Sequence, residues 1–287
     1  MTTGICHHES MASASASASA SGVTGSHGQA RSLAVGTWVV DLDGVIWLAG
    51  DPIEGAGAAV GRLQRAGIRV LFATNNAEPT DAELRGRLAV AGVTAGADDL
   101  VTSAHAAASM LASGSSAMCV GGLGVDEALH SRGVRVLPAR DDAGVPDAVV
   151  VGLTHDFTYD VLRVAATAVR RGARLIGTND DPTHPTPQGL LPGSGALVAA
   201  VATAAEVVPE LAGKPHRPMA DLVRARAVDV TVVVGDRPAT DGVLAQRLGV
   251  PYALVRSGVL RSGDPGGTHA EFDYADLAAL VDAVVGP

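Results

Sequence analysis

From residue 37 onward, short apolar runs alternate with stretches of helical periodicity. The segments 37–40 (TWVV) and 69–73 (RVLFA) have the length and the β-branched, apolar character of buried strands. Between them, residues 56–66 place apolar side chains at helical spacing. Thr80 and Glu83 then have the spacing of a capping box, which predicts the start of a second helix. This part of the chain therefore reads as successive βα units.

The same alternation continues to the end of the chain. We expect further helices over 103–114, 125–133, 159–172, 196–205, 219–227 and 243–249, and further strands over 117–122, 147–153, 174–178, 230–236 and 252–255. A segment rich in Pro and Gly, 179–195, interrupts the pattern. Helices that alternate with short apolar strands predict an α/β protein with parallel sheets, and the middle of the chain has the pattern of a self-contained βαβ block.

The composition agrees with this fold class. A chain of 287 residues is long enough to bury a large core, and 47% of its residues are hydrophobic. Only 3% are aromatic, so Val, Leu and Ala must fill that core. Such a core is more typical of helices packed on a parallel sheet than of an aromatic-rich sandwich.

Charge and cysteine content exclude several kinds of partner. The formal net charge is −9 and no run of Lys or Arg occurs, which argues against nucleic acid and against an anionic membrane surface. No apolar run approaches the roughly 20 residues that a bilayer span needs. The two cysteines have no metal-like spacing, so we expect a reducing, cytoplasmic environment. The Ala/Ser-rich residues 1–31 are predicted to be a disordered tail.

Polar residues gather where the predicted strands end. These residues are Asp41, Asp43, Thr74, Asn75, Asn76, Asp236 and Asp241. In open α/β sheets, ligands bind beyond the carboxyl ends of the strands, so we expect these side chains to face one crevice. An Asp at a strand end is also common as a helix N-cap or turn residue, and each of these acids taken alone is explained as well in that way.

One basic residue stands apart from the others. Lys214, in the loop AGKPHRP, is the only lysine of the chain, and every other basic residue is arginine. Converging carboxylates repel one another unless positive charge lies among them, and Mg²⁺ is the hard cation that suits carboxylate and phosphate oxygens. No His or Cys occurs at the strand ends 41–45, 74–76 and 235–241, which argues against zinc. The combination suits phosphoryl transfer through an aspartyl phosphate.

The order of these motifs resembles a known family. DLDGV (41–45), TNN (74–76), GKP (213–215) and GDRPATD (235–241) resemble the motifs of the haloacid dehalogenase-like (HAD) phosphatases. The stretches FATNN, VTSA, HDFTYDVL, TNDDPTHPTPQGLLPGSG and AGKP are similar to the subgroup with a large α/β cap domain. The resemblance covers nearly everything from Thr37 to the C-terminus.

The resemblance implies a fold and a role for each polar residue. We expect a Rossmann-like core at 32–97 and 209–287 and an inserted α/β cap at 98–208. Asp41 corresponds to the nucleophile and Asp43 to the general acid and base. Mg²⁺ is expected at Asp41, Asp236 and the backbone carbonyl of Asp43, with Asp241 orienting the ion's waters or the lysine.

The remaining predicted site residues face the substrate. Thr74 and Asn75 are expected to hydrogen-bond the phosphoryl oxygens, with Asn76 as a weaker candidate beside them. His184 lies where relatives turn back from the cap, and contact with the substrate is as plausible there as a surface position. Lys214 is expected to place a compact ammonium between Asp41 and the phosphoryl group, where the planar fork of an arginine needs different spacing.

The function that follows is a Mg²⁺-dependent phosphomonoesterase acting on a small phosphorylated metabolite, with glycerol 3-phosphate or 2-phosphoglycolate favoured. A nucleoside monophosphate or pyridoxal phosphate is the alternative substrate. A module that binds phosphate esters without turnover is the alternative from another class. The cap is a candidate surface for a homodimer.

Overall fold

The structure is a computed structural model that describes residues 30–139, 144–186, 189–258, 260 and 270–286. Residues 1–29, which make up nearly all of the predicted tail, lie outside the described residues. Ala30 and the short 3₁₀ turn η1 (Arg31–Leu33) are described, and both Ala30 and Leu33 are buried. The described fold therefore begins at the end of the segment that we predicted as tail.

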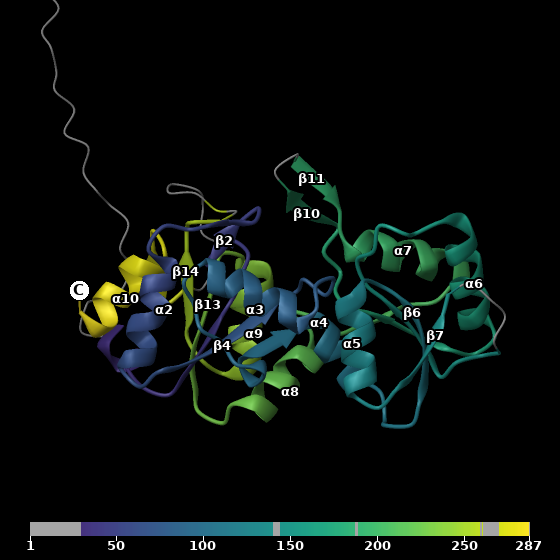
Figure 1. The fold of residues 1–287 in the computed structure, drawn as a ribbon, viewed down its shortest axis with the longest axis horizontal. Helices are drawn as coiled ribbons and strands as arrows, with labels where there is room; N and C mark the ends of the chain where they lie inside the picture. The colour runs from purple at the N-terminus through teal and green to yellow at the C-terminus, as the bar shows by residue number, and fades with distance from the viewer. Residues whose placement is uncertain (1–29, 140–143, 187–188, 259, 261–269, 287) are drawn as a thin grey trace, which may run out of the picture.

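A six-stranded sheet forms the first lobe of the molecule (Figure 1). Its order is β15-β14-β13-β1-β4-β5, and all of its strands are parallel. The strands are β1 (Thr37–Val40), β4 (Arg69–Thr74), β5 (Leu100–Thr102), β13 (Val230–Gly235), β14 (Tyr252–Val255) and β15 (Phe272–Tyr274). The chain enters this sheet in two separate stretches, as the prediction of an inserted domain requires.

Helices cover both faces of this sheet because its strands are apolar on both faces. Trp38 and Val40 point into one buried cluster, which includes side chains of α2 and α10, and Val39 points into the cluster on the opposite face. The helices of this lobe are α2 (Ala56–Arg65), α3 (Asp81–Val90), α4 (Ser103–Ser109), α8 (Arg217–Arg226), α9 (Val243–Leu248) and α10 (Leu277–Val285), with the turns η2 (Ala97–Asp99) and η3 (Pro238–Gly242). The capping box of Thr80 and Glu83 at the start of α3 is confirmed.

The middle of the chain forms a second, five-stranded sheet, which makes the other lobe in Figure 1. Its order is β12-β9-β8-β6-β7, again all parallel. The strands are β6 (Ser116–Val120), β7 (Arg135–Pro138), β8 (Ala148–Val151), β9 (Arg174–Gly177) and β12 (Glu210–Leu211), and the helices are α5 (Leu123–Ser131), α6 (Tyr159–Arg170) and α7 (Ser194–Ala205). The predicted α/β fold with two parallel sheets is confirmed.

Both predicted boundaries of the insert need correction. Residues 100–102 form β5, which pairs with β4 in the six-stranded sheet, although we placed them in the cap. The turn η2, at residues 97–99, directly precedes β5. At the other end, residues 210–211 form β12 and pair with β9 of the second sheet. A strand of two or three residues has too little periodicity to be seen in the sequence.

Two antiparallel ribbons, which the sequence pattern did not predict, flank the junction of the lobes. One joins β2 (Trp47–Leu48) to β3 (Asp51–Pro52), directly after the Asp41–Asp43 loop. The other joins β10 (Thr183–Thr186) to β11 (Gly189–Pro192) within the Pro/Gly-rich segment, and it projects above the junction (Figure 1). Among the described residues, no helix is both long and apolar enough to span a bilayer.

Candidate active site

The predicted acids and hydroxyl meet at one edge of the first sheet. Asp41 directly follows β1, Thr74 ends β4 and Asp236 directly follows β13. Since β13, β1 and β4 are neighbours and all parallel, their carboxyl ends lie side by side. The backbone N–H of Asp41 still donates to the carbonyl of Val234 at 2.9 Å, so the pairing of β1 with β13 extends to Asp41.

Lys214 lies among these carboxylates and is almost completely buried, with 3% of its side chain exposed. Its Nζ is 2.6 Å from Asp41 Oδ1 and 2.7 Å from Asp241 Oδ1. Asp241 is held from a second side, because the backbone N–H of Arg237 donates to its Oδ2 at 3.1 Å. Asp241 thus orients the lysine, which is one of the two tasks that we expected of it.

For both Asp41 and Lys214, burial and the charge of the ion-pair partner shift the pKa in opposite directions. Burial raises the pKa of Asp41 well above its usual value, the charge of Lys214 opposes that rise, and the charges of Asp241, Asp236 and Asp43 add to it. For Lys214, burial alone lowers the pKa, but the charges of Asp241 and Asp41 outweigh it and the pKa is raised overall. The lysine is therefore held as an ammonium, and the site has an excess of carboxylates.

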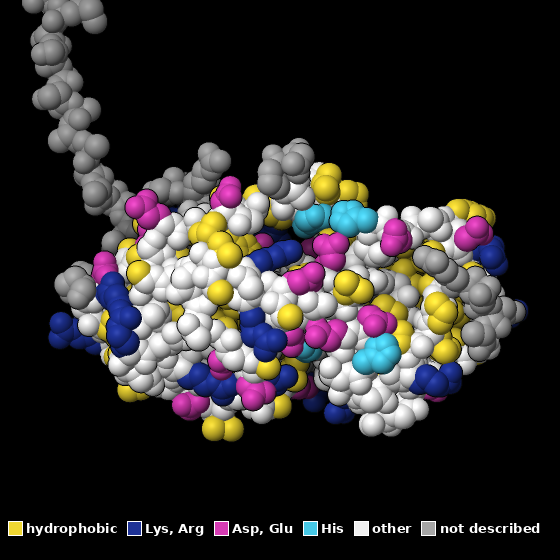
Figure 2. Space-filling view, in the orientation of Figure 1, with side chains coloured by type: hydrophobic (Ala, Val, Ile, Leu, Met, Phe, Trp, Pro, Cys, Tyr) yellow, Lys and Arg dark blue, Asp and Glu magenta, His cyan; other side chains and the backbone are white. Residues whose placement is uncertain are grey.

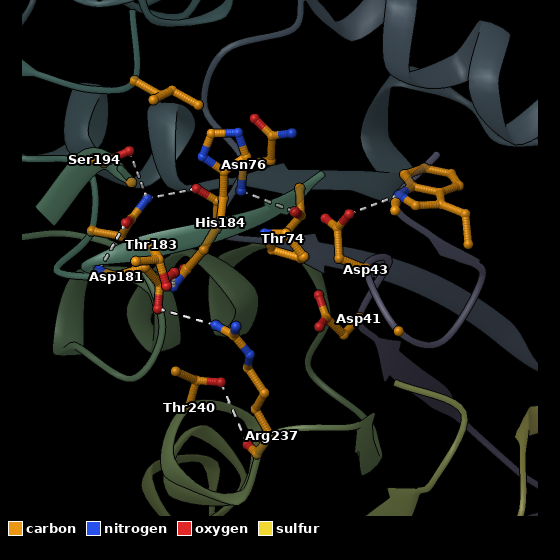
Figure 3. A pocket seen from close by; sticks show the side chains of 18 of the residues that line it. Asp41, Asp43, Thr74, Asn76, Asp181, Thr183, His184, Ser194, Arg237 and Thr240 are labelled. Atoms are coloured by element: carbon orange, nitrogen blue, oxygen red, sulfur yellow. Dashed lines mark hydrogen bonds and ion pairs between the residues drawn. The ribbon is translucent and has the colours of Figure 1, made fainter. Parts of the chain in front are cut away.

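Asp43 has a different environment from Asp41. The indole Nε1 of Trp47 donates to its Oδ1 at 3.0 Å, and this contact is visible in Figure 3. Burial raises the pKa of Asp43, and the hydrogen bond from Trp47 and the charge of Lys214 reduce that rise. A carboxyl whose pKa is raised holds its proton more readily, as the donor in general acid catalysis must.

The donor set fits a hard divalent cation. Asp41, Asp236 and Asp241 are all buried, and each offers a carboxylate oxygen within 4.8 Å of the others. The space beside Asp236 is kept open by glycine: a Cβ on Gly258 would lie 2.0 Å from Asp236 Oδ2, and a Cβ on Gly44 would lie 2.4 Å from it. Oxygen ligands of this kind suit Mg²⁺. Asp241 also contacts Lys214 Nζ and the backbone N–H of Arg237.

Asn75 lines the cavity, and its side-chain amide braces the lysine loop. Its Oδ1 accepts from the backbone N–H of Lys214 at 2.7 Å, and its Nδ2 donates to the backbone carbonyl of Lys214 at 3.0 Å. The same Nδ2 donates to Asp181 Oδ2 at 2.9 Å. The side chain is therefore occupied by protein, which leaves the main-chain N–H as the group of Asn75 that can meet a phosphoryl oxygen.

Exchanging the Asn75 amide for a carboxylate is expected to destabilise the site. In Asn75→Asp an acceptor replaces Nδ2 and faces two acceptors, the Lys214 carbonyl and Asp181. Losing these buried bonds costs about 1–3 kcal/mol, which thermal unfolding should register as a lower Tm. Asn76→Asp is the matched control, because its Oδ1 accepts from the backbone N–H of Glu78 and a carboxylate keeps that bond. Equal Tm values for the two variants would contradict the bracing role.

The other predicted substrate residues line one cavity of about 370 Å³ between the lobes. Thr74 Oγ1 accepts from the backbone N–H of Asn76 at 3.0 Å, which leaves the hydroxyl proton available for a ligand. His184 lies on β10, and its Nδ1 is 3.2 Å from the carbonyl of Pro192. Figure 3 shows Asp41, Asp43 and Thr74 on one side of the cavity and Asp181, Thr183 and His184 on the other.

Several residues of this cavity were not predicted. Asp181, Arg237, Asn179 and Ser194 all line it. Arg237 lies in the quoted motif GDRPATD, and Asp181 lies in the segment 178–195 that carried the resemblance. Neither residue was assigned a role from the sequence. Figure 2 shows acidic, histidine and basic side chains gathered around the junction of the lobes, below the β10–β11 ribbon. The site is thus completed by cap residues that no local pattern distinguishes.

Two family models match the chain in the regions that form the core. A model described as haloacid dehalogenase-like hydrolase matches residues 38–135, and a HAD-hydrolase-like model matches residues 211–280. The chain belongs to the haloacid dehalogenase-like hydrolase family. The predicted resemblance is confirmed, and the two matched regions contain the strand ends and the lysine loop of this HAD site.

Named relatives of this HAD protein are phosphatases. It is 38% identical over 231 residues to a D-glycerol 3-phosphate phosphatase of Mycobacterium tuberculosis, which covers 79% of this chain and 64% of that relative. The chain thus spans less than two thirds of that protein. It is 34% identical to an acid sugar phosphatase of Staphylococcus haemolyticus, over 77% of this chain and 85% of that one.

Solved structures agree with the HAD fold. A glycerol phosphate phosphatase of Mycobacterium tuberculosis in complex with magnesium superposes with a TM-score of 0.77 at 35% identity, covering 88% of this chain and 77% of that one. A hypothetical protein of Pyrococcus horikoshii gives a TM-score of 0.81 at 30% identity, over 86% of this chain and 99% of that one. The similarity therefore extends over both lobes.

Proposed function

We propose that this protein is a Mg²⁺-dependent phosphatase that hydrolyses phosphate monoesters through a phosphorylated Asp41. The observation that carries the proposal is the buried ammonium of Lys214 between Asp41 and Asp241, at the point where the strand ends bearing Asp41, Thr74 and Asp236 meet. The ammonium of Lys214 offsets the negative charge of Asp41, which lowers its repulsion of an anionic ester. Asp41 nevertheless stays ionised, so its carboxylate can attack phosphorus.

In the first step, a carboxylate oxygen of Asp41 attacks phosphorus in line with the ester oxygen. Lys214 and the hydroxyl of Thr74 stabilise the charge that spreads over the phosphoryl oxygens. The carboxyl of Asp43 gives its proton to the leaving alcohol as the bond from phosphorus to that oxygen breaks. The products of this step are the free alcohol and an acyl phosphate on Asp41.

In the second step, Asp43 now serves as the base. It takes a proton from a water that attacks the phosphorus, and the bond between phosphorus and Asp41 breaks. Inorganic phosphate leaves and the Asp41 carboxylate is restored. Asp41 is buried and Asp43 is half-buried, which limits the access of bulk water to the acyl phosphate, so that hydrolysis passes through the water that Asp43 positions.

Mg²⁺ bound at Asp41 and Asp236, when present, neutralises charge on the phosphoryl group and on the carboxylates. Similarity to a phosphatase solved with magnesium supports this assignment. The excess of buried carboxylates over the single buried ammonium supports it independently, because the site is otherwise left with uncompensated negative charge.

Glycerol 3-phosphate is the substrate that we favour. The support is the 38% identity to a D-glycerol 3-phosphate phosphatase. A cavity of about 370 Å³ lies near the lower end of the usual range for ligand sites, which suits a small metabolite better than a nucleotide. 2-Phosphoglycolate, pyridoxal phosphate and nucleoside monophosphates remain the rival substrates.

Phosphate release from these esters and from 4-nitrophenyl phosphate tests the proposal. With Mg²⁺ we expect turnover that prefers glycerol 3-phosphate, and an excess of EDTA should abolish it because the carboxylates are then no longer neutralised. Restoring Mg²⁺ should restore the rate, and circular dichroism in EDTA controls for loss of fold. Release that continues unchanged in EDTA would refute the metal dependence, and tight ester binding without release would support the non-catalytic module.

We also propose that the protein works in the cytoplasm and pairs through its cap. Within the described residues, Cys119 is a free thiol, which is in keeping with a reducing compartment. On the cap, Val207 and Val208 are exposed beside α7, which supports pairing through this surface. Light scattering of the purified protein distinguishes a dimer from a monomer.

A further inference from the structure

We propose that Asp181 is a specificity-determining residue that makes this site prefer phosphate esters with an uncharged, hydroxylated leaving group over esters whose leaving group carries a carboxylate. The inference rests on the proposed phosphatase function and names the class of substrate that the site accepts. It concerns the cap side of the cavity, where the alcohol part of the ester must lie if phosphorus faces Asp41.

The main chain of Asp181 is fixed in place. Its N–H donates to Asn179 Oδ1 at 3.1 Å, and its carbonyl accepts from the N–H of Gly195 at 2.9 Å. Gly193 packs directly on this carbonyl, since a Cβ there would lie 2.4 Å from the oxygen. The carboxylate therefore projects from a rigid segment between β9 and β10.

Two core residues hold the carboxylate at the cavity wall. Asn75 Nδ2 donates to its Oδ2 at 2.9 Å, and Arg237 Nη1 lies 3.4 Å from its Oδ1. Only about a fifth of the Asp181 side chain, 21%, is exposed, and 33% of the Arg237 side chain is exposed. Figure 3 shows Arg237 reaching across toward Asp181, and both residues line the cavity. The negative charge thus has a defined position beside the space for the leaving group.

The charges on this side of the cavity are balanced without a ligand. The ammonium of Lys214 is shared by Asp41 and Asp241, so it serves the phosphoryl side. On the cap side, Arg237 is matched by Asp181. Glu78 and Arg87, one acid and one base, also line the cavity. A leaving-group carboxylate that approaches Arg237 must compete with Asp181 for it, and the two like charges repel in a confined space.

A hydroxyl group meets no such penalty. It can donate to Asp181 and accept from Arg237 at the same time, and the side chains of Thr183 and Thr240 on the same cavity offer further hydroxyls. The pair of opposite charges is therefore complementary to a neutral polyol chain such as glycerol. Rejection of the carboxylate adds to this preference, since specificity is a difference between two affinities.

Two esters that differ only at one carbon make the test sharp. Glycerol 3-phosphate and 3-phosphoglycerate have the same length, and a CH₂OH group in the first is a carboxylate in the second. We use the ratio of kcat/KM for 3-phosphoglycerate to that for glycerol 3-phosphate. Any general loss of activity cancels in this ratio, so a purely structural role of Asp181 leaves it unchanged.

Asp181→Asn keeps an oxygen for Asn75 but removes the charge and releases Arg237. We expect the ratio to rise by about tenfold or more. Arg237→Gln leaves Asp181 without its counter-charge, and we expect the ratio to fall instead. The matched control is Asp180→Asn: its Oδ2 contacts His216 Nε2 at 3.1 Å, it lies outside the cavity lining, and its ratio should equal that of the wild type.

An unchanged ratio in Asp181→Asn, with both esters slowed equally, would overturn the inference and leave Asp181 as a tie between cap and core. Failure of the proposed function is a separate result, because no ester is then turned over by the wild type. In that event the ratio of the association constants of 3-phosphoglycerate and glycerol 3-phosphate, measured by calorimetry on an Asp41→Asn background with and without Asp181→Asn, replaces the kinetic ratio. This ratio is expected to rise with Asp181→Asn, and it decides the inference.

Discussion

Asp41→Asn is expected to remove the phosphatase activity while the protein stays folded. The amide is nearly the same shape as the carboxylate, but it is no nucleophile, so a loss of about 10⁴-fold or more is expected. The fold should survive because burial disfavours the charged form of Asp41, as its raised pKa indicates. Lys214 keeps Asp241 as its counter-charge at 2.7 Å. Phosphate release with Mg²⁺ and glycerol 3-phosphate measures the loss.

A second measurement ties the loss to the covalent step. Acid quenching during turnover of an ester radiolabelled in its phosphoryl group should leave label on the wild-type chain and none on Asp41→Asn. Asp51→Asn is the matched control, since Asp51 is exposed on the neighbouring β2–β3 ribbon and its charge serves no buried group. If Asp41→Asn kept a tenth of the wild-type rate, a phosphorylated Asp41 could not be the intermediate.

The sequence could predict that Asp41, Thr74 and Asp236 lie close together because all three lie at strand ends. Asp41, Thr74 and Asp236 each follow an apolar run that is recognisable by itself, and the rule for ligands in open α/β sheets then brings the runs together. Strands and helices that are recognisable by their own length and periodicity could thus be predicted without knowledge of their tertiary contacts.

The sequence could not predict what depends on contacts across the lobes. Asn75 looked like a phosphate ligand because it follows Thr74, yet its amide is bound to the Lys214 main chain 139 positions further along. Asp181 and Arg237 pair over 56 positions, and neither has a local pattern that marks it. The strands β5 and β12 were assigned to the wrong lobes for the same reason, since their pairing partners alone define them.

Lys214→Arg tests why the only lysine of the chain is found here. The ammonium touches carboxylate oxygens at 2.6 Å and 2.7 Å and has 3% of its side chain exposed, so no room surrounds it. A guanidinium is broad and planar, and overpacking of this kind costs about 1–3 kcal/mol. The charge of the guanidinium is also delocalised over three nitrogens, so less of it lies beside the Asp41 oxygen that attacks phosphorus. We therefore expect kcat to fall by about 10²-fold or more with the positive charge retained.

Lys214→Met separates the shape of this side chain from its charge. Methionine has a similar length but leaves Asp41 and Asp241 without their shared counter-charge, so we expect a loss of about 3 kcal/mol in the free energy of unfolding as well as a loss of activity. Saturating Mg²⁺ should return part of that stability, because the cation replaces some of the missing charge. Comparable activity in the wild type and Lys214→Arg would show that any buried cation suffices. The compact geometry of the ammonium would then have no part in the choice of lysine.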